Sequence, residues 1–267
     1  MFLVRKFFVD NQRPKICASI TEEDKLSVTA AADIMVQKKV DIVEWRIDFY
    51  KKLEDFSEVD ETLKRVHESL GKIPILVTYR TENEGGNGKL SGEEYRELIL
   101  NLSKNCFVDL VDVEVFNGRV MEDDVKAFCG DEGLTVPEIL EFIQTVRENA
   151  AVIGSYHNFK STPDKETIKA ALEIIDSVGC DILKIALMPE KNGDVLRLMT
   201  SVNELKEEGV SKPIIAMSMG KIGSVSRIIG ESFGSCLTFA SVGQESAPGQ
   251  IEVSKLTNLL DTMHSLR

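Results

Sequence analysis

Eight short apolar runs, separated by longer amphipathic segments, dominate the pattern of hydrophobic and polar positions along the chain. Apolar runs of this length, bounded by turn residues, are typical of strands that are covered on both faces of a parallel sheet. The runs lie at residues 15–20, 41–48, 74–80, 108–115, 151–157, 181–187, 213–219 and 235–241. A strand and a helix alternating eight times over about 250 residues predict an α/β fold, a (β/α)8 TIM barrel that spans residues 1–267 as a single domain.

Two stretches do not fit the simple repeat. The apolar stretch 2–9 is expected to add an extra strand or hairpin before the barrel, and the connection 116–150 is expected to hold two helices, at about 121–129 and 136–149. A doubly wound open sheet is the alternative fold, but the glycine-rich turn that usually follows its first strand is absent. The barrel is therefore the preferred prediction.

The predicted helices have recognisable ends. Capping pairs are expected at Thr21–Asp24 and Ser91–Glu94, and Pro163 is expected at a first helical position. Glycines that allow a left-handed backbone are expected to end three helices, at Gly71, Gly179 and Gly209.

The interior positions of the predicted strands carry many polar residues. Side chains two apart on a strand share a face, and barrel active sites lie at the C-terminal ends of the strands. The interior set is Glu44, Arg46, Arg80, Asp112, Glu114, Ser155, His157, Lys184, Met217, Met219, Phe239 and Ser241. So many buried charges are costly, which predicts an active site at this rim, with a structural ion-pair network as the alternative.

Lys184 stands at the centre of the apolar run 180–188. An ammonium group is costly to bury, so this lysine is either paired with a carboxylate or neutral. Desolvation lowers the pKa of a lysine, and a neutral amine attacks carbonyl groups. The run alone leaves both interpretations open, a structural lysine and a nucleophile.

His157 is the one histidine of three that ends a predicted strand. An imidazole transfers protons readily near neutral pH, although a hydrogen-bonded structural histidine is the alternative. His67 lies on an amphipathic helix and His264 close to the C-terminus, where neither needs a functional role. In the loop 78–86, Glu84 is placed where it could orient a histidine.

Two further segments follow the last strands. The loop 244–250 has small residues between polar ends, which suits either a lid that closes over a ligand or a plain connection. The segment 218–227 leads into a predicted helix, and helix N-termini attract anions. Arg227 could there form a fork with a carboxylate or phosphate.

Composition narrows the class of partner. The chain is 43% hydrophobic and 28% charged, which is ordinary for a soluble globular protein. Its net charge of −12 argues against nucleic acid and anionic membranes, so an anionic ligand needs a local cationic cluster. The stretch 2–9 is too short and too charged for a signal peptide or membrane span, so a cytoplasmic location is expected.

Metal and disulfide chemistry find little support. The five cysteines are odd in number and scattered, with no CxxC pair, and no HExxH motif is present. Glu44, Asp112 and Glu114 could hold magnesium, but the neighbouring cations argue against it. Those cations are Arg46, Arg80 and Lys184.

Six motifs, taken together and in order, resemble the type I 3-dehydroquinate dehydratases over nearly the whole chain, from Ser19 to Gln250. They are EWRID (44–48), TYRTENEGG (78–86), SYHNF (155–159), KIA (184–186), MSMGKIGSVSR (217–227) and SAPGQ (246–250). The resemblance implies a (β/α)8 barrel that forms a homodimer and uses no metal or organic cofactor. It also implies conversion of 3-dehydroquinate to 3-dehydroshikimate and water in the shikimate pathway.

The resemblance also implies a role for each matching residue. Lys184 would form the Schiff base, and His157, held by Glu84, would be the general acid and base. Arg227 would bind the substrate carboxylate, and Glu44, Arg46 and Arg80 the ring hydroxyls. The other substrate-binding positions would be Ser19, Met217, Met219, Phe239, Ser246, Ala247 and Gln250. The family commonly has Asp where this chain has Asn158, a change expected to lower the pKa of His157 without abolishing activity.

Two rival functions remain at this point. A Schiff-base aldolase of the same barrel class would use glycine-rich phosphate sites after strands seven and eight, whereas Arg227 and a glutamine-bearing loop suit a carboxylate. A non-catalytic ligand-binding barrel would need another reason to keep both Lys184 and His157. Trapping of a lysine imine with borohydride separates that last possibility from the two enzymes.

Overall fold

A ring of parallel strands forms the centre of the molecule in the computed structural model, which describes residues 13–90, 92–116 and 136–267. The strands are β1 (Lys15–Ile20), β2 (Ile42–Arg46), β3 (Ile75–Thr78), β4 (Leu110–Glu114), β5 (Ala151–Asn158), β6 (Ile182–Leu187), β7 (Ile214–Ser218), β8 (Leu237–Ser241) and the short β9 (Ile251–Glu252). Each strand from β1 to β7 pairs in parallel with the next, and β1 also pairs with β8. All eight predicted strands are confirmed.

The ring closes weakly between β7 and β8. A single bridge joins Ile214 to Ser235, and the Cys236 amide donates to the Ile214 carbonyl at 2.8 Å. The short strand β9 pairs with β8 on the edge opposite β1. Because the sheet curls back on itself, the predicted (β/α)8 barrel is confirmed and the doubly wound open sheet is excluded.

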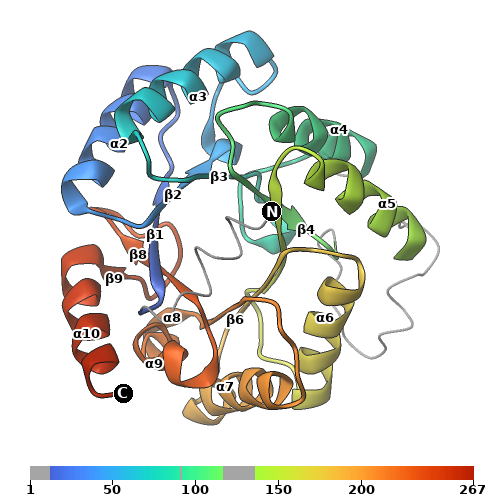
Figure 1. Cartoon of the computed structure of the whole chain (residues 1–267), viewed down its shortest axis with the longest axis vertical. Coiled ribbons are helices and arrows are strands. Elements are labelled where there is room, and N and C mark those ends of the chain that lie inside the picture. The colour runs from blue at the N-terminus through green and yellow to red at the C-terminus, as the bar shows by residue number, and fades with distance from the viewer. Residues whose placement is uncertain (1–12, 91, 117–135) are drawn as a thin grey trace.

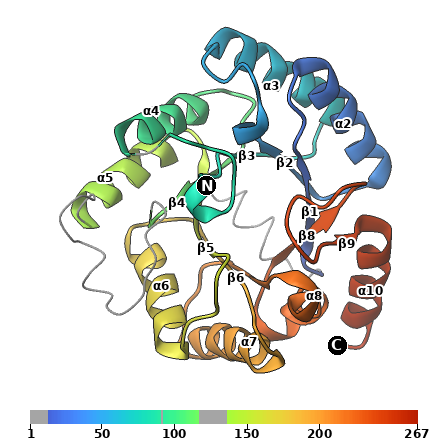
Figure 2. The same ribbon diagram turned by 180° about the vertical axis from the view of Figure 1, so that it is seen from behind.

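Helices surround the ring on its outside in both views (Figures 1 and 2). The long ones are α2 (Lys25–Lys38), α3 (Phe56–Leu70), α4 (Gly92–Ser103), α5 (Val136–Arg147), α6 (Lys165–Ser177), α7 (Asn192–Glu207) and α10 (Val253–Ser265). Shorter turns among the described residues are η1 (Ile47–Phe49), η2 (Glu82–Glu84), α8 (Gly220–Gly223), α9 (Ser226–Ile229) and η4 (Gly230–Phe233). α5 confirms the second helix expected in 116–150; the first, at 121–129, and the stretch 2–9 lie outside the described residues.

Two helix starts differ from the prediction. Asp24 is itself the N-cap of α2 and accepts from the Leu26 and Ser27 amides, so Thr21 does not cap it. Asp164 caps α6 by accepting from the Thr167 amide at 2.8 Å, so Pro163 precedes the helix instead of opening it. In both cases a carboxylate nearer the helix satisfies the free amides.

Helix ends follow the prediction more closely. Gly71 is the C-cap of α3, while Gly179 and Gly209 follow the C-caps of α6 and α7 with φ of 87° and 103°. Glycine is the residue that adopts this left-handed backbone without strain. Ser91, half of the other predicted capping pair, is outside the described residues.

The barrel interior changes character along its axis. Nearer the strand starts it is apolar, with side chains such as Ile42, Leu76 and Leu110 in one buried cluster. Towards the strand ends, Glu44, Asp112 and Lys184 replace them and are also buried. The interior charges therefore gather at the C-terminal rim, where the sequence predicts the active site.

Aspartates fasten the opposite rim. Asp41, Asp109 and Asp181 each precede a strand and accept from a backbone amide of the strand before it, at 2.8, 2.9 and 3.0 Å. These carboxylates satisfy amides at the strand starts, far along the strands from the charged rim.

Candidate active site

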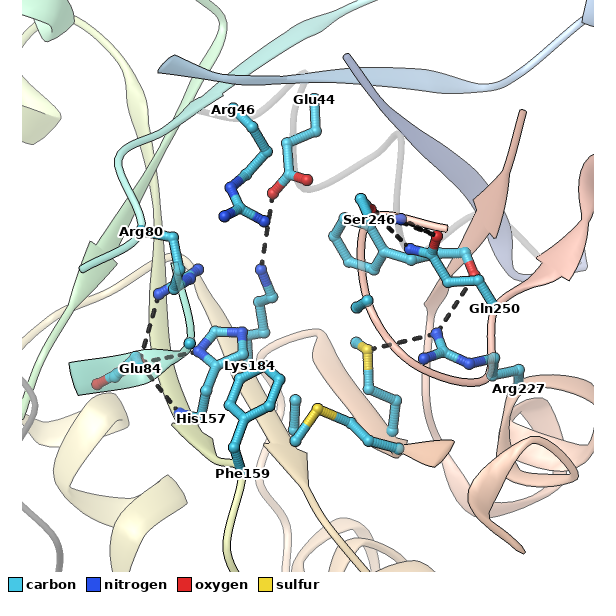
Figure 3. A pocket seen from close by; sticks show the side chains of 16 residues that line it. Glu44, Arg46, Arg80, Glu84, His157, Phe159, Lys184, Arg227, Ser246 and Gln250 are labelled. Carbon is cyan, nitrogen blue, oxygen red and sulfur yellow. Dashed lines mark hydrogen bonds and ion pairs between the residues drawn. The ribbon is translucent and has the colours of Figure 1, made fainter. Parts of the chain in front are cut away.

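A pocket of about 490 Å³, part of it open to solvent, lies within the charged rim (Figure 3). Its lining residues are Glu44, Arg46, Arg80, Glu84, Gly85, His157, Phe159, Lys184, Ala186, Met217, Met219, Arg227, Phe239, Ser246, Ala247 and Gln250. Of the residues to which the resemblance gives a role, all but Ser19 line the pocket, and Ser19 hydrogen-bonds Glu44 at 2.5 Å. Of the interior set predicted from strand parity, Asp112, Glu114, Ser155 and Ser241 are not among the lining residues. Gly85, Phe159 and Ala186 were missed, although Phe159 and Ala186 lie two residues beyond His157 and Lys184 and so share their face.

Lys184 lies in the middle of β6 and points into the barrel. Its Nζ donates to Asp112 Oδ2 at 2.7 Å and lies 4.0 Å from Glu44 Oε1. The Phe239 ring centroid is 4.7 Å from the same nitrogen. The lysine is paired with a buried carboxylate, as the structural interpretation predicted. It also reaches the pocket, which the interpretation as a nucleophile requires.

A buried ion-pair network lies beneath the pocket. The Arg80 guanidinium contacts Asp112 at 2.8 Å, Glu114 at 2.9 Å and Glu84 at 3.3 Å. Burial alone would raise the pKa of Asp112, but the positive charges of Arg80 and Lys184 outweigh it and hold that pKa at about 2. The structural ion-pair network that was the alternative to an active site is therefore present, and the pocket is present beside it. Asp112 and Glu114 belong to the interior set predicted from strand parity, but the resemblance gave neither of them a role.

His157 ends β5 beside a carboxylate from the loop after β3. Its Nδ1 lies 2.8 Å from Glu84 Oε2, and its backbone amide donates to the same oxygen at 3.1 Å. The other ring nitrogen lies on the side of Lys184 (Figure 3). Burial, reinforced by the positive charges of Arg80 and Lys184, keeps the pKa of His157 well below 6.5, so the imidazole is neutral at pH 7.

The pKa of Glu84 is shifted in the opposite direction from that of His157. Burial, and then the negative charge of Glu114, raise the pKa of Glu84 well above 4.5, against the lowering effect of Arg80. Its contact with His157 is the one that the orienting role expected from the sequence requires. Oppositely shifted neighbouring groups are characteristic of sites that transfer protons.

Arg227 is a buried cation at the far side of the pocket. It donates to the carbonyls of Phe239 and Pro248, both at 3.3 Å, and to Met217 Sδ at 3.7 Å, while its Nε has no partner. No carboxylate in the described part of the chain forms an ion pair with it. Burial lowers the pKa of Arg227 to about 10, with Glu245 acting in the other direction. An unpaired buried guanidinium is a site for an anion.

The helix expected after β7 is present only as two short turns. α8 and α9 are single turns of four residues each, and Arg227 lies inside the second. Turns this short have little macrodipole, so a helix N-terminus adds little to the attraction of an anion here. The positive charge of the guanidinium itself accounts for anion attraction here.

The loop 244–250 forms one wall of the pocket. Gln250 donates to Ser246 Oγ at 2.9 Å and accepts from the Ser246 amide at 3.0 Å, and Ser246 donates to Ser19 at 3.1 Å. A Cβ on Gly249 would lie 2.2 Å from the Gly220 carbonyl oxygen, so the loop packs closely on the turn after β7. The loop therefore contributes residues to the site, as the sequence indicates.

Asn158 is directed away from the pocket. Its Oδ1 accepts from the Lys160 and Ser161 amides at 2.9 and 3.0 Å and so shapes the turn after β5. The pKa of His157 is lowered by burial and by the nearby cations, and Asn158 is not among the causes.

Within the described residues, no group of three or more histidine, cysteine, aspartate or glutamate side chains is placed to hold a metal ion. No helix among those residues has the length and apolar character needed to cross a membrane.

The fold and the pocket define a TIM-barrel-like α/β protein with a lysine, a carboxylate-held histidine and an unpaired arginine at its C-terminal rim. The family model described as type I 3-dehydroquinase matches residues 16–267, and the chain belongs to this family. This confirms the resemblance in the sequence.

Related proteins agree with this assignment. The chain is 37% identical to a 3-dehydroquinate dehydratase of Listeria monocytogenes serotype 4a, over 94% of this chain and 93% of the relative. A crystal structure of type I 3-dehydroquinate dehydratase from Clostridium difficile with covalently modified comenic acid has a TM-score of 0.85 at 35% identity, covering 96% of this chain and 94% of that one. A 3-dehydroquinate dehydratase structure from Geobacillus kaustophilus HTA426 has a TM-score of 0.83 at 33% identity, covering 94% and 91%.

Proposed function

We propose that this protein dehydrates 3-dehydroquinate to 3-dehydroshikimate through a Schiff base on Lys184. Membership of the type I 3-dehydroquinase family supports the reaction. The observation that carries the residue roles is the arrangement of Lys184, His157 and Arg227 around one pocket. It offers a nucleophile, a proton carrier and an anion site to one small molecule.

The chemistry follows from these three groups. The Lys184 ammonium first passes a proton to His157, and the free amine adds to the substrate ketone. His157 then returns that proton to the carbinolamine hydroxyl, which leaves as water and gives a protonated imine. The iminium carries the same single positive charge as the ammonium, so Asp112 at 2.7 Å stays its counter-ion. The neutral imidazole of His157 takes the proton from the adjacent carbon, and the iminium accepts the electron pair. His157 then protonates the departing hydroxyl, and water releases the product from Lys184.

Substrate binding divides among the remaining residues. Arg227 is assigned the carboxylate, with Ser246 and Gln250 beside it, and Glu44 and Arg46 the ring hydroxyls. Arg80 was expected to bind hydroxyls too, but its guanidinium donates hydrogen bonds to Asp112, Glu84, Glu114 and Ser155. We therefore assign Arg80 to positioning the network. Ser19 supports Glu44, and Met217, Met219, Phe239 and Ala247 form the apolar walls.

An absorbance assay for the conjugated enone product tests this function. Adding 3-dehydroquinate should produce the enone with the wild-type chain and not with Lys184→Met, and the rate should survive EDTA. Absence of the enone, or activity that EDTA removes and added metal restores, would contradict the proposal. Cleavage of a sugar phosphate would favour the aldolase alternative, and binding without turnover the non-catalytic barrel.

We also propose a homodimer in the cytoplasm, both implied by resemblance to the family. The 267-residue chain has a mass of 29.7 kDa. Sedimentation equilibrium at micromolar concentration should give twice this mass. Cell fractionation should place the protein with cytoplasmic markers. A monomer at all concentrations, or recovery with membranes, would contradict the respective proposal.

A further inference from the structure

Asp48, just after β2, holds the Arg46 guanidinium by a fork of two hydrogen bonds. Its Oδ1 accepts from Arg46 Nε and its Oδ2 from Arg46 Nη2, both at 2.7 Å. The Asp48 side chain is fully buried and that of Arg46 is 9% exposed. Paired bonds of this kind fix the plane of a guanidinium as well as its position. Arg46 therefore reaches the pocket in an orientation set by Asp48.

The same carboxylate also holds the loop that follows β3. Asp48 Oδ1 accepts from the Arg80 amide at 3.3 Å, and Oδ2 accepts from the Asn87 amide at 3.1 Å. These amides stand at the two ends of the loop 80–88. One side chain thus fastens both ends of a loop to the end of the neighbouring strand.

The loop transmits this constraint to His157. It is closed by bonds from the Gly88 amide to the Arg80 carbonyl at 2.9 Å and from the Glu82 amide to the Gly88 carbonyl at 2.8 Å. A Cβ on Gly86 would lie 2.1 Å from the Arg80 carbonyl oxygen, so the loop has no room to shift inward. Glu84, which orients His157, lies within this closed loop.

We propose that Asp48 is a positioning residue that couples the substrate-binding Arg46 to the Glu84–His157 pair. It contacts neither pocket nor substrate, and it acts through these two partners. The proposal rests on the proposed function, because its kinetic part uses 3-dehydroquinate. Loss of Asp48 should weaken substrate binding, through a freely rotating Arg46, and slow proton transfer, through a looser Glu84.

The test substitutes Asp48→Asn, which keeps the size of the side chain but replaces one acceptor oxygen with a donor amide. Ordering one long side chain on binding weakens affinity by about 2- to 12-fold, so KM should rise by that factor. kcat should fall as well, while borohydride still traps the imine. The amount of trapped imine gives the number of active sites, and each rate is divided by that number. Asp109→Asn is the matched control, because Asp109 also accepts a backbone amide, from Ile75, but at the opposite rim.

Double-mutant cycles separate positioning from stability. The rise in KM should disappear when Asp48→Asn is added to Arg46→Ala, and the fall in kcat should disappear when it is added to Glu84→Gln. Additive effects in both cycles would overturn the proposal. So would variants that melt earlier but show wild-type KM and kcat per trapped site.

Amide hydrogen exchange gives a reading that does not depend on turnover. Asp48→Asn should speed exchange of the Arg80 and Asn87 amides, and Asp109→Asn should leave both unchanged. Unchanged exchange in Asp48→Asn would overturn the proposal even if the kinetics changed. A wild-type chain that fails to act on 3-dehydroquinate would instead contradict the proposed function, and the exchange experiment would still decide the role of Asp48.

Discussion

Replacing Arg227 with methionine should weaken substrate binding without weakening the fold. Arg227 is buried and has no ion-pair partner in the described residues, and burial lowers its pKa from an ordinary 12.5 to about 10. That fall corresponds to a cost of roughly 3 kcal/mol for keeping the guanidinium charged in the folded protein. The cost applies below pH 10, where Arg227 is charged in both folded and unfolded chains. Arg227→Met removes the charge while keeping an apolar side chain of similar length, so the melting temperature should stay or rise.

Arg80 is the matched control for stability. It is also a buried arginine of the same pocket, but it contacts Asp112, Glu114 and Glu84. Arg80→Met would leave these carboxylates buried without their cation, which costs about 3–5 kcal/mol. Thermal denaturation should therefore separate the two variants clearly.

Substrate binding, in contrast to stability, should weaken in Arg227→Met. A charge-assisted hydrogen bond contributes about 1.5–3 kcal/mol, so Arg227→Met should lower kcat/KM by roughly 10- to 150-fold, mainly through KM. Arg227→Lys should recover only part, since an ammonium cannot form the planar fork. Gln250→Ala should cost less, because a neutral amide contributes less than a charge.

Two results of the enone assay and the melting curves would refute this reasoning. An unchanged KM in Arg227→Met would mean that the carboxylate binds elsewhere, with Arg46 the next candidate. A loss of stability as large as that of Arg80→Met would mean that Arg227 is a structural residue.

Three further outcomes are expected. His157→Ala should accumulate a borohydride-trappable adduct while kcat falls by roughly 10²–10⁴-fold; near-normal kcat would show that another group moves the proton. The acid limb of kcat/KM should lie below pH 6.5, because the pKa of His157 is lowered by burial, and a limb at or above 6.5 would contradict a neutral His157. Asp112→Asn should cost about 3–5 kcal/mol of unfolding free energy at pH 7. Because the pKa of Asp112 falls from 3.8 to about 2, its stabilisation is present above pH 3.8 and lost as pH falls through 2, so a penalty unchanged at pH 2 would contradict this.

The sequence predicted the barrel well because each strand is covered on both faces. A strand such as β6 must then be apolar at nearly every position, and a charged exception such as Lys184 stands out. Strand parity also predicted which side chains share the pocket, because alternate residues on a parallel strand reach the same side.

Contacts between residues that are far apart in the sequence could not be predicted in the same way. Asp112 and Asp48 each hold a site residue. Strand parity placed Asp112 in the barrel interior and Asp48 lies in the EWRID motif, but neither observation identifies the residue that each one holds. Their roles depend on which strands are neighbours and on register, as with Thr78 opposite Asp112 between β3 and β4. Local competition explains the helix starts: Asp24 and Asp164 cap their helices because each carboxylate reaches the free amides directly.

Borohydride trapping with peptide mass mapping tests the central claim most directly. Reduction in the presence of 3-dehydroquinate should inactivate the enzyme, add the mass of the reduced adduct once per chain, and place it on the peptide that contains Lys184. Lys184→Met should gain no mass under the same conditions. A label on another lysine, or full turnover with no trapped adduct, would contradict a Schiff base on Lys184.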